Sequence, residues 1–404
     1  MLTLSNGRGT GGKIKQSPDD FVVREITRSG HTLELGRTYG AAELGGEEAT
    51  DGKQITFVLQ KRNWNTINAV QAVAKWMGRG RKSVGYAGTK DKFAVSVQLA
   101  SVFHPEPFDM SSVRIKDISI NGSWRGNGVR IGDNLGNAFD VAIRGAERPD
   151  AVEGIAEELE GRMPNYFGPQ RFGERGNNAE IGLMIMRGDL EGAVMELLTG
   201  TKNETGAEVT EARKRLKEEG DLRAALGYFP KFLKGERTVI AHLSEYRKDW
   251  AGALRMLPRG LSLMLVHAVQ DLIFNEELEE RIREKDFETE AYAARDFYGF
   301  PDIEKIGEKG DFPLACMVGY DTDDGKVGEY AREILERMGI KKEEFKIRSV
   351  PELSARGSYR PLLAPVKDLK YQIEGENDVR LGFELPSGSY ATVLLHEFMK
   401  TAEA

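Results

Sequence analysis

Cysteine is almost absent from this chain of 404 residues, which contains Cys316 and no other. A single thiol excludes an internal disulfide framework and is typical of proteins from a reducing cytosol. Histidine is also scarce, and the five histidines lack the HxxxH or HExxH spacing of a metal site. The sequence has no P-loop and no Rossmann glycine pattern. It therefore predicts no metal and no nucleotide or flavin cofactor.

Long apolar runs are missing as well. The most apolar stretches, 261–266 and 314–318, are far shorter than the roughly 20 residues of a membrane helix. The first residues lack the apolar core of a signal peptide. Apolar residues make up 40% of the chain and charged residues 30%, as in ordinary folded proteins. We therefore expect a cytoplasmic protein with two or three domains and no membrane contact.

Acidic residues are absent from residues 54–90, although the whole chain has 64 of them and a net charge of −7. A local excess of positive charge in an acidic chain predicts contact with the phosphates of a nucleic acid. A solvated basic helix face is the alternative interpretation. The residues that we expect to contact phosphate are Lys61, Arg62, Arg79, Arg81 and Lys82.

A single carboxylate, Asp91, follows this basic segment in the stretch GYAGTKDKFAVSVQ, residues 85–98. Lysines on both sides favour its ionised form, which a nucleophile or an anionic base requires. Gly88 indicates a turn before Asp91, and alternating apolar residues from 93 to 99 indicate a half-buried strand after it. Asp91 would then lie at the rim of a sheet. In the alternative, purely structural reading the carboxylate only accepts hydrogen bonds from turn amides.

The first third of the chain predicts short strands and one helix. The helix extends over 67–77, with an N-cap at Asn65 and a stop at Gly78. β-branched and aromatic residues mark the predicted strands, which are 21–26, 55–60, 83–86, 93–102, 113–120 and 138–143.

Helical patterns dominate the acid-rich part of the chain, and strand patterns return after it at 370–374 and 380–384, before a last helix over 391–400. One β-rich module interrupted by an insertion explains this alternation. We therefore expect an α+β protein. Its first domain would combine residues 1–177 and 347–404, and a largely helical α+β insertion domain would occupy 178–346.

Three further segments could carry chemistry. Lys15 precedes the strand predicted at 21–26 and could reach a carboxylate on a neighbouring element. The loop NYFGPQRFG, residues 165–173, is too rich in Gly and Pro for a regular element, yet it holds three aromatic residues. Ser389 and Tyr390 lie at a helix start, where free backbone amides and an aromatic ring meet. Taken singly, each segment is also compatible with a structural role.

Together these segments resemble the motifs of the TruD family of tRNA pseudouridine synthases. The motifs follow one another in the family's order and span most of the chain outside 178–346. They are KQSPDDFVVRE, LQKRNWNT, GTKDKFAVSVQ, NLGNAF, NYFGPQRFG and LPSGSYAT. Within 178–346, the segments RMLPR and HAVQ resemble the insertion domain of the family's archaeal and eukaryotic branch.

The resemblance implies a pseudouridine-synthase catalytic domain, with an antiparallel sheet platform and helices, and a V-shaped two-domain molecule. It assigns the catalytic carboxylate to Asp91 and the lysine that pairs with it to Lys15. The implied partner is tRNA, with U13 of the D-arm as the target, and no obligate protein partner is implied. The isomerisation involves no net redox change or hydrolysis, so no cofactor is expected.

The resemblance also implies a set of residues around a uridine that has left its stack. Phe167 would stack on the base, and Asn165 would contact the uracil. Tyr390 stands where bacterial relatives often have Phe, and either ring can stack. The expected substrate-binding residues are Phe21, Lys90, Asn165, Phe167, Arg171 and Tyr390.

Two other functions are compatible with parts of this pattern. A non-catalytic RNA-binding or RNA-folding protein could use the same basic patch and aromatic loop. It would have no need for a carboxylate beside RNA phosphates. An unrelated hydrolase could pair Asp91 with Glu25 as general acid and base, although no second carboxylate motif is recognisable. For the synthase, the sequence leaves open whether Asp91 attacks as a nucleophile or takes a proton from the sugar.

Overall fold

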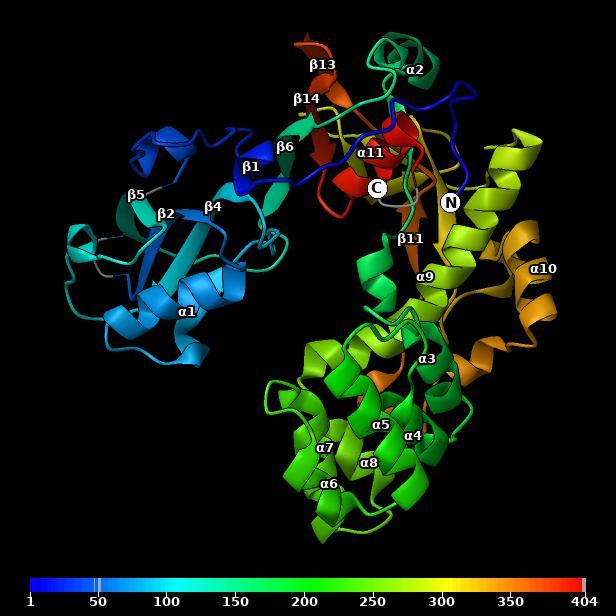
Figure 1. Ribbon diagram of the computed structural model, residues 1–404. Helices are drawn as coiled ribbons and strands as arrows, with labels where there is room; N and C mark the ends of the chain where they lie inside the picture. Colours follow the sequence, from blue (N-terminus) through cyan, green and yellow to red (C-terminus); the bar gives the residue numbers. More distant parts are fainter. Residues whose placement is uncertain (47, 50–51, 402–404) are drawn as a thin grey trace. The chain divides into compact units, whose positions relative to one another are not determined.

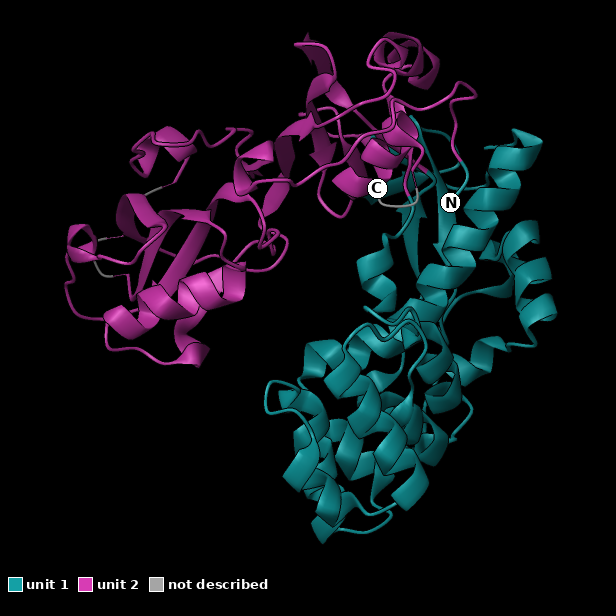
Figure 2. Ribbon diagram, in the orientation of Figure 1, with its two compact units in different colours: residues 1–2, 166–294, 303–362 teal, residues 3–165, 295–302, 363–404 magenta. Residues whose placement is uncertain are grey.

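The computed structural model describes residues 1–46, 48–49 and 52–401 and has two compact units (Figures 1 and 2). Unit 1 consists of Met1–Leu2, Tyr166–Ala294 and Ile303–Leu362. Unit 2 consists of Thr3–Asn165, Arg295–Asp302 and Leu363–Ala404. Each unit therefore combines segments that are distant in the sequence. The expected insertion domain, 178–346, lies within unit 1 apart from residues 295–302, and both of its expected limits fall inside that unit.

Unit 2 is built on one large sheet, in which strands follow the order β13-β14-β6-β1-β4-β2-β5 and β3 pairs with β4. Neighbouring strands are antiparallel except β1 and β4, which are parallel. This confirms the predicted α+β class with an antiparallel platform. The strands are β1 (Phe21–Thr27), β2 (Gln54–Arg62), β3 (Val84–Tyr86), β4 (Val95–Phe103), β5 (Ile118–Gly126), β6 (Asn134–Ile143), β13 (Lys367–Glu374) and β14 (Asp378–Pro386).

Helix α1 (Thr66–Trp76) agrees with the predicted helix and covers one face of this sheet (Figure 1). The side chain of Asn65 accepts a hydrogen bond from the amide of Asn68 at 2.7 Å, which caps the first turn. Gly78 adopts φ +71° just beyond the helix end. The buried side of α1 packs on β2 and β4 in a core that includes Phe57, Val70, Val73 and Ala100.

Two further helices belong to unit 2, α2 (Ala151–Leu159) and α11 (Ala391–Met399), and they contact one another. A short antiparallel pair, β7 (Arg162–Pro164) and β12 (Leu363–Pro365), lies next to α11 and β14. Strand β14 returns from the C-terminal part of the chain to pair with β6, which places Phe383 opposite Phe139. The final segment therefore completes the sheet that the first third begins.

Unit 1 is mainly helical, and its longest helix, α9, contacts α3 most extensively (Figure 1). None of the helices in the described part of the chain is both long and apolar enough to cross a membrane. The helices are α3 (Asn178–Met186), α4 (Leu190–Thr199), α5 (Ala207–Glu219), α6 (Leu222–Tyr228), α7 (Lys234–Glu245), α8 (Trp250–Arg255), α9 (Arg259–Glu284) and α10 (Glu329–Met338).

A second sheet accompanies these helices, with the strand order β11-β10-β8-β9. Its strands were not expected individually, because they lie in a part of the sequence dominated by helical patterns. Nearly all side chains of β9 are exposed, so its sequence lacks the alternation of apolar and polar residues that would predict a strand. The strands are β8 (Tyr292–Arg295), β9 (Pro301–Gly307), β10 (Phe312–Met317) and β11 (Ser358–Pro361).

Two strand predictions in unit 2 were wrong in detail. The strand expected at 113–120 begins only at Ile118, because Asp117 takes a positive φ of 62° and turns the chain. β4 was expected to be half-buried but is buried on both faces. It lies between β1 and β2, and Val97 packs against Leu33 and Tyr39 on the face opposite α1.

Replacing either of two helical glycines by alanine should change the free energy of unfolding, but in opposite directions. A Cβ at Gly182 in α3 would lie 2.1 Å from the carbonyl oxygen of Leu265 in α9, whereas one at Gly154 in α2 would meet no atom within 4 Å. We predict that Gly182→Ala lowers the free energy of unfolding by about 1–3 kcal/mol, because the helices must separate. Gly154→Ala should raise it by about 0.5–1 kcal/mol. Urea titration followed by helical circular dichroism measures both, and a stable Gly182→Ala would contradict the close packing.

Candidate active site

Lys15 and Asp91 form an ion pair at the edge of the large sheet, with 3.1 Å between Nζ and Oδ2. Their side chains are 23% and 31% exposed, so the pair is accessible from solvent. Asp91 lies in the loop before β4, and Lys15 lies in the segment before β1. Because β1 and β4 are parallel, the segments that enter them reach the same edge of the sheet.

Lys15 is held in an unusual backbone conformation, with φ of 57°. This left-handed conformation is uncommon for residues other than glycine and costs free energy. The ammonium of Lys15 lies 4.3 Å from the centre of the Phe21 ring, which adds a cation–π contact to the ion pair. The turn at Lys15 thus directs its side chain toward Asp91 and Phe21 together.

Buried polar contacts fix the loop that carries Asp91. The hydroxyl of Thr66 accepts a hydrogen bond from the Lys90 amide at 2.8 Å and donates one to Gln98 at 2.8 Å. The amide of the Gln98 side chain donates to the carbonyl of Gly88 at 3.0 Å. Because the start of α1 and the interior of β4 hold both sides of the loop, its backbone has little freedom.

Lys90 is not on the surface, although the sequence suggested contact with substrate. Its ammonium lies 2.9 Å from the carboxylate of Glu25 in β1, and both side chains are almost fully buried. The other carboxylate oxygen of Glu25 accepts a hydrogen bond from the amide of Leu99. Glu25 is therefore occupied by Lys90 and the sheet, which leaves the hypothesis of a hydrolase pair with Asp91 without support.

Lys61 also differs from its expected position among the phosphate contacts. Its side chain is fully buried, and its ammonium donates a hydrogen bond to the backbone carbonyl of Asp91 at 2.8 Å. Burial lowers the pKa of Lys61 to about 8, against the opposing effect of the Asp91 carboxylate. An ammonium so enclosed is out of reach of a phosphate at the protein surface.

The remaining cations of the basic segment are more exposed. Arg81 and Lys82 extend from a short 3-10 helix, Arg81–Ser83, and are exposed to solvent. Arg79 lies 3.1 Å from the carboxylate of Glu106, and Arg62 forms an ion pair with Asp19. Surface ion pairs of this kind contribute little to stability and exchange readily with other anions.

Phe21 begins a row of aromatic rings across the sheet. It packs edge-on against Phe139, and Phe139 stacks on Phe383 with 5.2 Å between ring centres. Only 1% of the surface of Phe21 is exposed, and the Lys15 ammonium covers one face of its ring. Phe21 was expected among the substrate-binding residues, but its ring is part of the core below the Lys15–Asp91 pair.

Asn165 and the start of α11 are joined within unit 2. The hydroxyl of Ser389 donates a hydrogen bond to the side-chain oxygen of Asn165 at 2.9 Å. Tyr390 is the N-cap residue of α11 and is partly exposed. The structure therefore brings together two of the segments that the sequence singled out.

Phe167 and Arg171 belong to unit 1, where α9 holds both. The side chain of Asn275 accepts a hydrogen bond from the amide of Phe167 at 2.9 Å and donates one to its carbonyl at 3.0 Å. The guanidinium of Arg360 lies 3.9 Å from the centre of the Phe167 ring, and Phe274 packs edge-on against that ring. The guanidinium of Arg171 also lies over this ring, at 5.6 Å, so two cations contact the ring while Asn275 clamps the backbone of Phe167.

Arg171 forms an ion pair with the buried carboxylate of Asp271, with 2.5 Å between Nε and Oδ2. Burial raises the pKa of Asp271 to about 6, although Arg171 acts in the opposite direction. No sequence motif indicated a role for Asn275, Asp271 or Arg360. The sequence did contain one indication of a polar site on α9: Gln270 and Asp271 interrupt the apolar stripe on the buried face of this helix.

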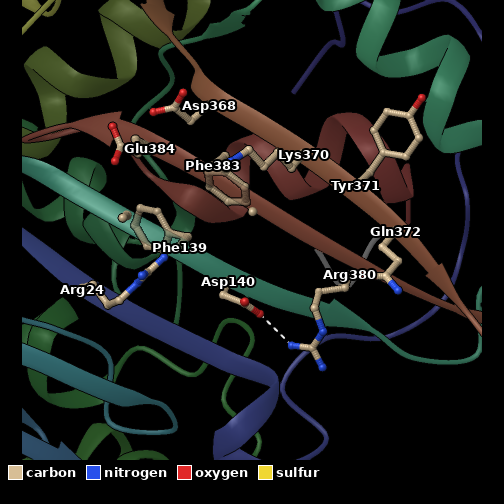
Figure 3. A pocket seen from close by; sticks show the side chains of 12 residues that line it. Arg24, Phe139, Asp140, Asp368, Lys370, Tyr371, Gln372, Arg380, Phe383 and Glu384 are labelled. Carbon is tan, nitrogen blue, oxygen red and sulfur yellow. Dashed lines mark hydrogen bonds and ion pairs between the residues drawn. The ribbon is translucent and has the colours of Figure 1, made fainter. Parts of the chain in front are cut away.

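A groove of about 460 Å³ lies on the sheet of unit 2 (Figure 3). Arg24 lines it, and because Arg24 and Glu25 are consecutive in β1, the groove lies on the face opposite the Glu25–Lys90 pair. The lining residues carry equal numbers of positive and negative charges, on Arg24, Lys370 and Arg380 and on Asp140, Asp368 and Glu384, and Arg380 pairs with Asp140 at 2.6 Å. The groove therefore has no surplus of either charge to attract an ion.

No group of three or more His, Cys, Asp or Glu side chains in the described ranges is arranged to hold a metal ion. The accessible charged groups of the candidate site are the carboxylate of Asp91 and the ammonium of Lys15. A carboxylate fixed by a lysine at an accessible edge can act as a nucleophile or as a base.

The raised pKa of Asp271 predicts a pH-dependent contribution to stability. In the folded protein Asp271 keeps its proton up to about pH 6, while in the unfolded chain it loses the proton near pH 4. The wild type should therefore lose stability relative to Asp271→Asn as the pH rises from about 4 to about 6, by up to about 3 kcal/mol. Urea titrations of both proteins at several pH values measure this difference. A difference that does not change with pH would contradict the assignment.

Comparisons with known proteins agree with one another. The family model for tRNA pseudouridine synthase D (TruD) matches residues 2–398. A probable tRNA pseudouridine synthase D from Methanopyrus kandleri is 35% identical over 384 residues, covering 93% of each chain. One from Thermococcus sibiricus is 33% identical over 430 residues, covering 98% of this chain and 97% of the relative.

A solved structure is also similar. The crystal structure of the putative tRNA pseudouridine synthase D from Methanosarcina mazei superposes with a TM-score of 0.76 at 29% sequence identity. The match covers 99% of this chain and 96% of that one. Sequence and fold therefore resemble the same group of proteins over almost their whole length.

Proposed function

This chain belongs to the tRNA pseudouridine synthase D (TruD) family, and on that premise we propose that it converts a uridine of tRNA into pseudouridine with Asp91 as the catalytic carboxylate. The observation that carries this proposal is the Lys15–Asp91 ion pair of 3.1 Å at an accessible edge of the sheet. The alternative, a non-catalytic RNA-binding protein, gains nothing from such a pair, because a carboxylate repels the phosphates that it would bind.

The reaction breaks the N1–C1′ bond of uridine and forms a C5–C1′ bond. The base gains a proton at N1 and loses one from C5, so atoms and charge balance without an oxidant or a water molecule. Asp91 acts on this path either as the nucleophile or by taking a proton from the sugar to give a glycal. Lys15 holds the carboxylate in place for both routes.

The uridine must leave its stack before Asp91 can reach it, at a cost of a few kcal/mol. Aromatic faces offset part of this cost, at about 1–3 kcal/mol for each stacked base. We assign this role to Phe167, because Asn275 clamps its backbone and Arg360 supports its ring. Asn165 and Tyr390 are assigned to the uracil and to a further aromatic contact. Phe21 acts from below the site, through Lys15.

The proposed substrate position is U13 in the D-arm of tRNA, as the resemblance to the family implies, and the protein would act in the cytoplasm. We propose that Arg62, Arg79, Arg81 and Lys82 contact the phosphates, because these cations of the basic segment reach the surface. The segment 178–346 would serve as the family's insertion domain and influence which RNA docks.

Replacement of Asp91 tests the catalytic role. We predict that Asp91→Asn binds tRNA as the wild type does but forms pseudouridine about 10³-fold more slowly or not at all, because the neutral amide is neither nucleophile nor base. Carbodiimide labelling and primer extension on unmodified tRNA transcripts measure the product, and a stop at position 13 identifies the target.

Asp150→Asn is the matched control, since Asp150 is exposed and its side chain makes no capping hydrogen bond to α2. It should keep full activity. Substantial turnover by Asp91→Asn, once mass spectrometry has excluded deamidation back to Asp, would remove Asp91 from the catalytic role. Tight binding without product from the wild type on every transcript would favour the RNA-binding protein.

The salt dependence of tRNA affinity tests the proposed phosphate contacts. Each neutralised contact should lower the slope of log affinity against log salt by about 0.7–0.9, because one fewer counterion is released. Arg81→Gln combined with Lys82→Gln should therefore lower the slope by about 1.4–1.8. Filter binding at several salt concentrations measures it, and an unchanged slope would show that RNA does not contact these two side chains.

A further inference from the structure

Lys61 is buried next to Asp91, but it has no role in the reaction proposed above. It lies near the end of β2, where Ser96 of β4 and Ile118 of β5 are its strand partners. Its side chain is 0% exposed, and the ammonium reaches the carbonyl oxygen of Asp91 at 2.8 Å. A cation that β2 anchors rigidly thus contacts the main chain of the residue whose carboxylate pairs with Lys15.

The burial of this ammonium is not offset by a carboxylate of its own. Glu25, on β1, is paired with Lys90 at 2.9 Å, and the carboxylate of Asp91 is paired with Lys15. Among the described residues, Lys61 forms no ion pair, and its hydrogen-bond acceptor is a neutral carbonyl. Burying a cation in this way costs several kcal/mol even after relaxation. Such a cost is typical of functional sites rather than of a structural core.

We propose that Lys61 is a positioning residue for the reaction at Asp91, an inference that rests on the proposed function. Its ammonium fixes the peptide group of Asp91, and therefore the direction in which the carboxylate leaves the chain. Lys15 fixes the other end of the same residue. Asp91 is thus held between two lysines: Lys61 of β2 contacts its main chain, and Lys15 of the segment before β1 contacts its side chain.

Stability and catalysis should respond differently to the loss of this ammonium. Methionine has a similar length and no charge, and replacing a buried charge by an apolar side chain is often neutral or stabilising. Lys61→Met should therefore fold at least as stably as the wild type. A displacement of the carboxylate by a fraction of an ångström is nevertheless enough to slow the reaction by about 10- to 100-fold. If Lys61 had only a structural role, Lys61→Met would lose stability, and the folded variant would keep its reaction rate.

The pH profile supplies a second distinction. Burial lowers the pKa of Lys61 to about 8, so its charge is present below pH 8 and is lost as the pH rises through that value. The charged groups around it are Asp91, which favours the charge, and Lys90, which opposes it; Lys90 is itself paired with Glu25 of β1. Its strand partners on β4 and β5, Ser96 and Ile118, are uncharged.

Activity and stability should therefore change in opposite directions above pH 8. Activity should fall, because the neutral amine holds the Asp91 carbonyl less strongly. The contribution of Lys61 to stability should rise, because the unfolded chain still binds a proton that the folded protein has released. Lys61→Met should show neither the fall in activity nor the rise in stability above pH 8 that depend on the charge of Lys61.

The test compares single-turnover rates of pseudouridine formation, tRNA affinity and urea stability between about pH 7 and about pH 10. The proteins are the full-length wild type, Lys61→Met, and Lys116→Met as an exposed lysine of the same unit. We expect Lys61→Met to react about 10- to 100-fold more slowly at pH 7, with unchanged affinity, undiminished stability and no alkaline limb near pH 8. Lys116→Met should match the wild type.

Three results would overturn the inference. Lys61→Met could react at the wild-type rate, it could lose stability or affinity in parallel with rate, or it could keep the alkaline limb of the wild type. A wild type that forms no pseudouridine at any pH would instead overturn the proposed function. That outcome is read from the wild type alone, so the two failures are distinguishable.

Discussion

The parallel pairing of β1 with β4 is the constraint on which the candidate site depends. In a sheet whose other neighbours are antiparallel, it makes these two strands begin at the same edge. Lys15 and Asp91, separated by 76 positions in the sequence, can therefore meet at 3.1 Å. Antiparallel pairing of the same strands would place the two side chains at opposite edges of the sheet.

The charged residues near the start of β1 and β4 fall into an accessible group and a buried group. Lys15 and Asp91 form an accessible ion pair, while Lys90, Glu25 and Lys61 lie beneath them in the protein interior. The buried groups orient the loop from below, so the carboxylate does not depend on solvent for its position. Such preorganisation is what catalysis by a fixed carboxylate requires.

The sequence was sufficient to predict the α+β class, α1, most strands of unit 2 and the pairing of Lys15 with Asp91. It could not distinguish an exposed lysine from a buried one, so Lys61 was expected to contact phosphate and Lys90 to contact substrate, although both are buried. Their burial follows from the strand order, which local patterns do not encode. The exposed strand β9 and the Asn275 clamp were missed because neither leaves an apolar periodicity or a recognisable motif.

The division of unit 2 into separated segments has a consequence for synthesis on the ribosome. Strand β6 pairs with β14, and β14 is synthesised only after the whole of unit 1. During most of translation β6 is therefore an edge strand of the sheet without its partner on that side. Unit 1, by contrast, is nearly continuous in the sequence and mainly helical. The nascent chain should therefore form unit 1 early and close the sheet of unit 2 last, in a slow step set by the long separation of its strands.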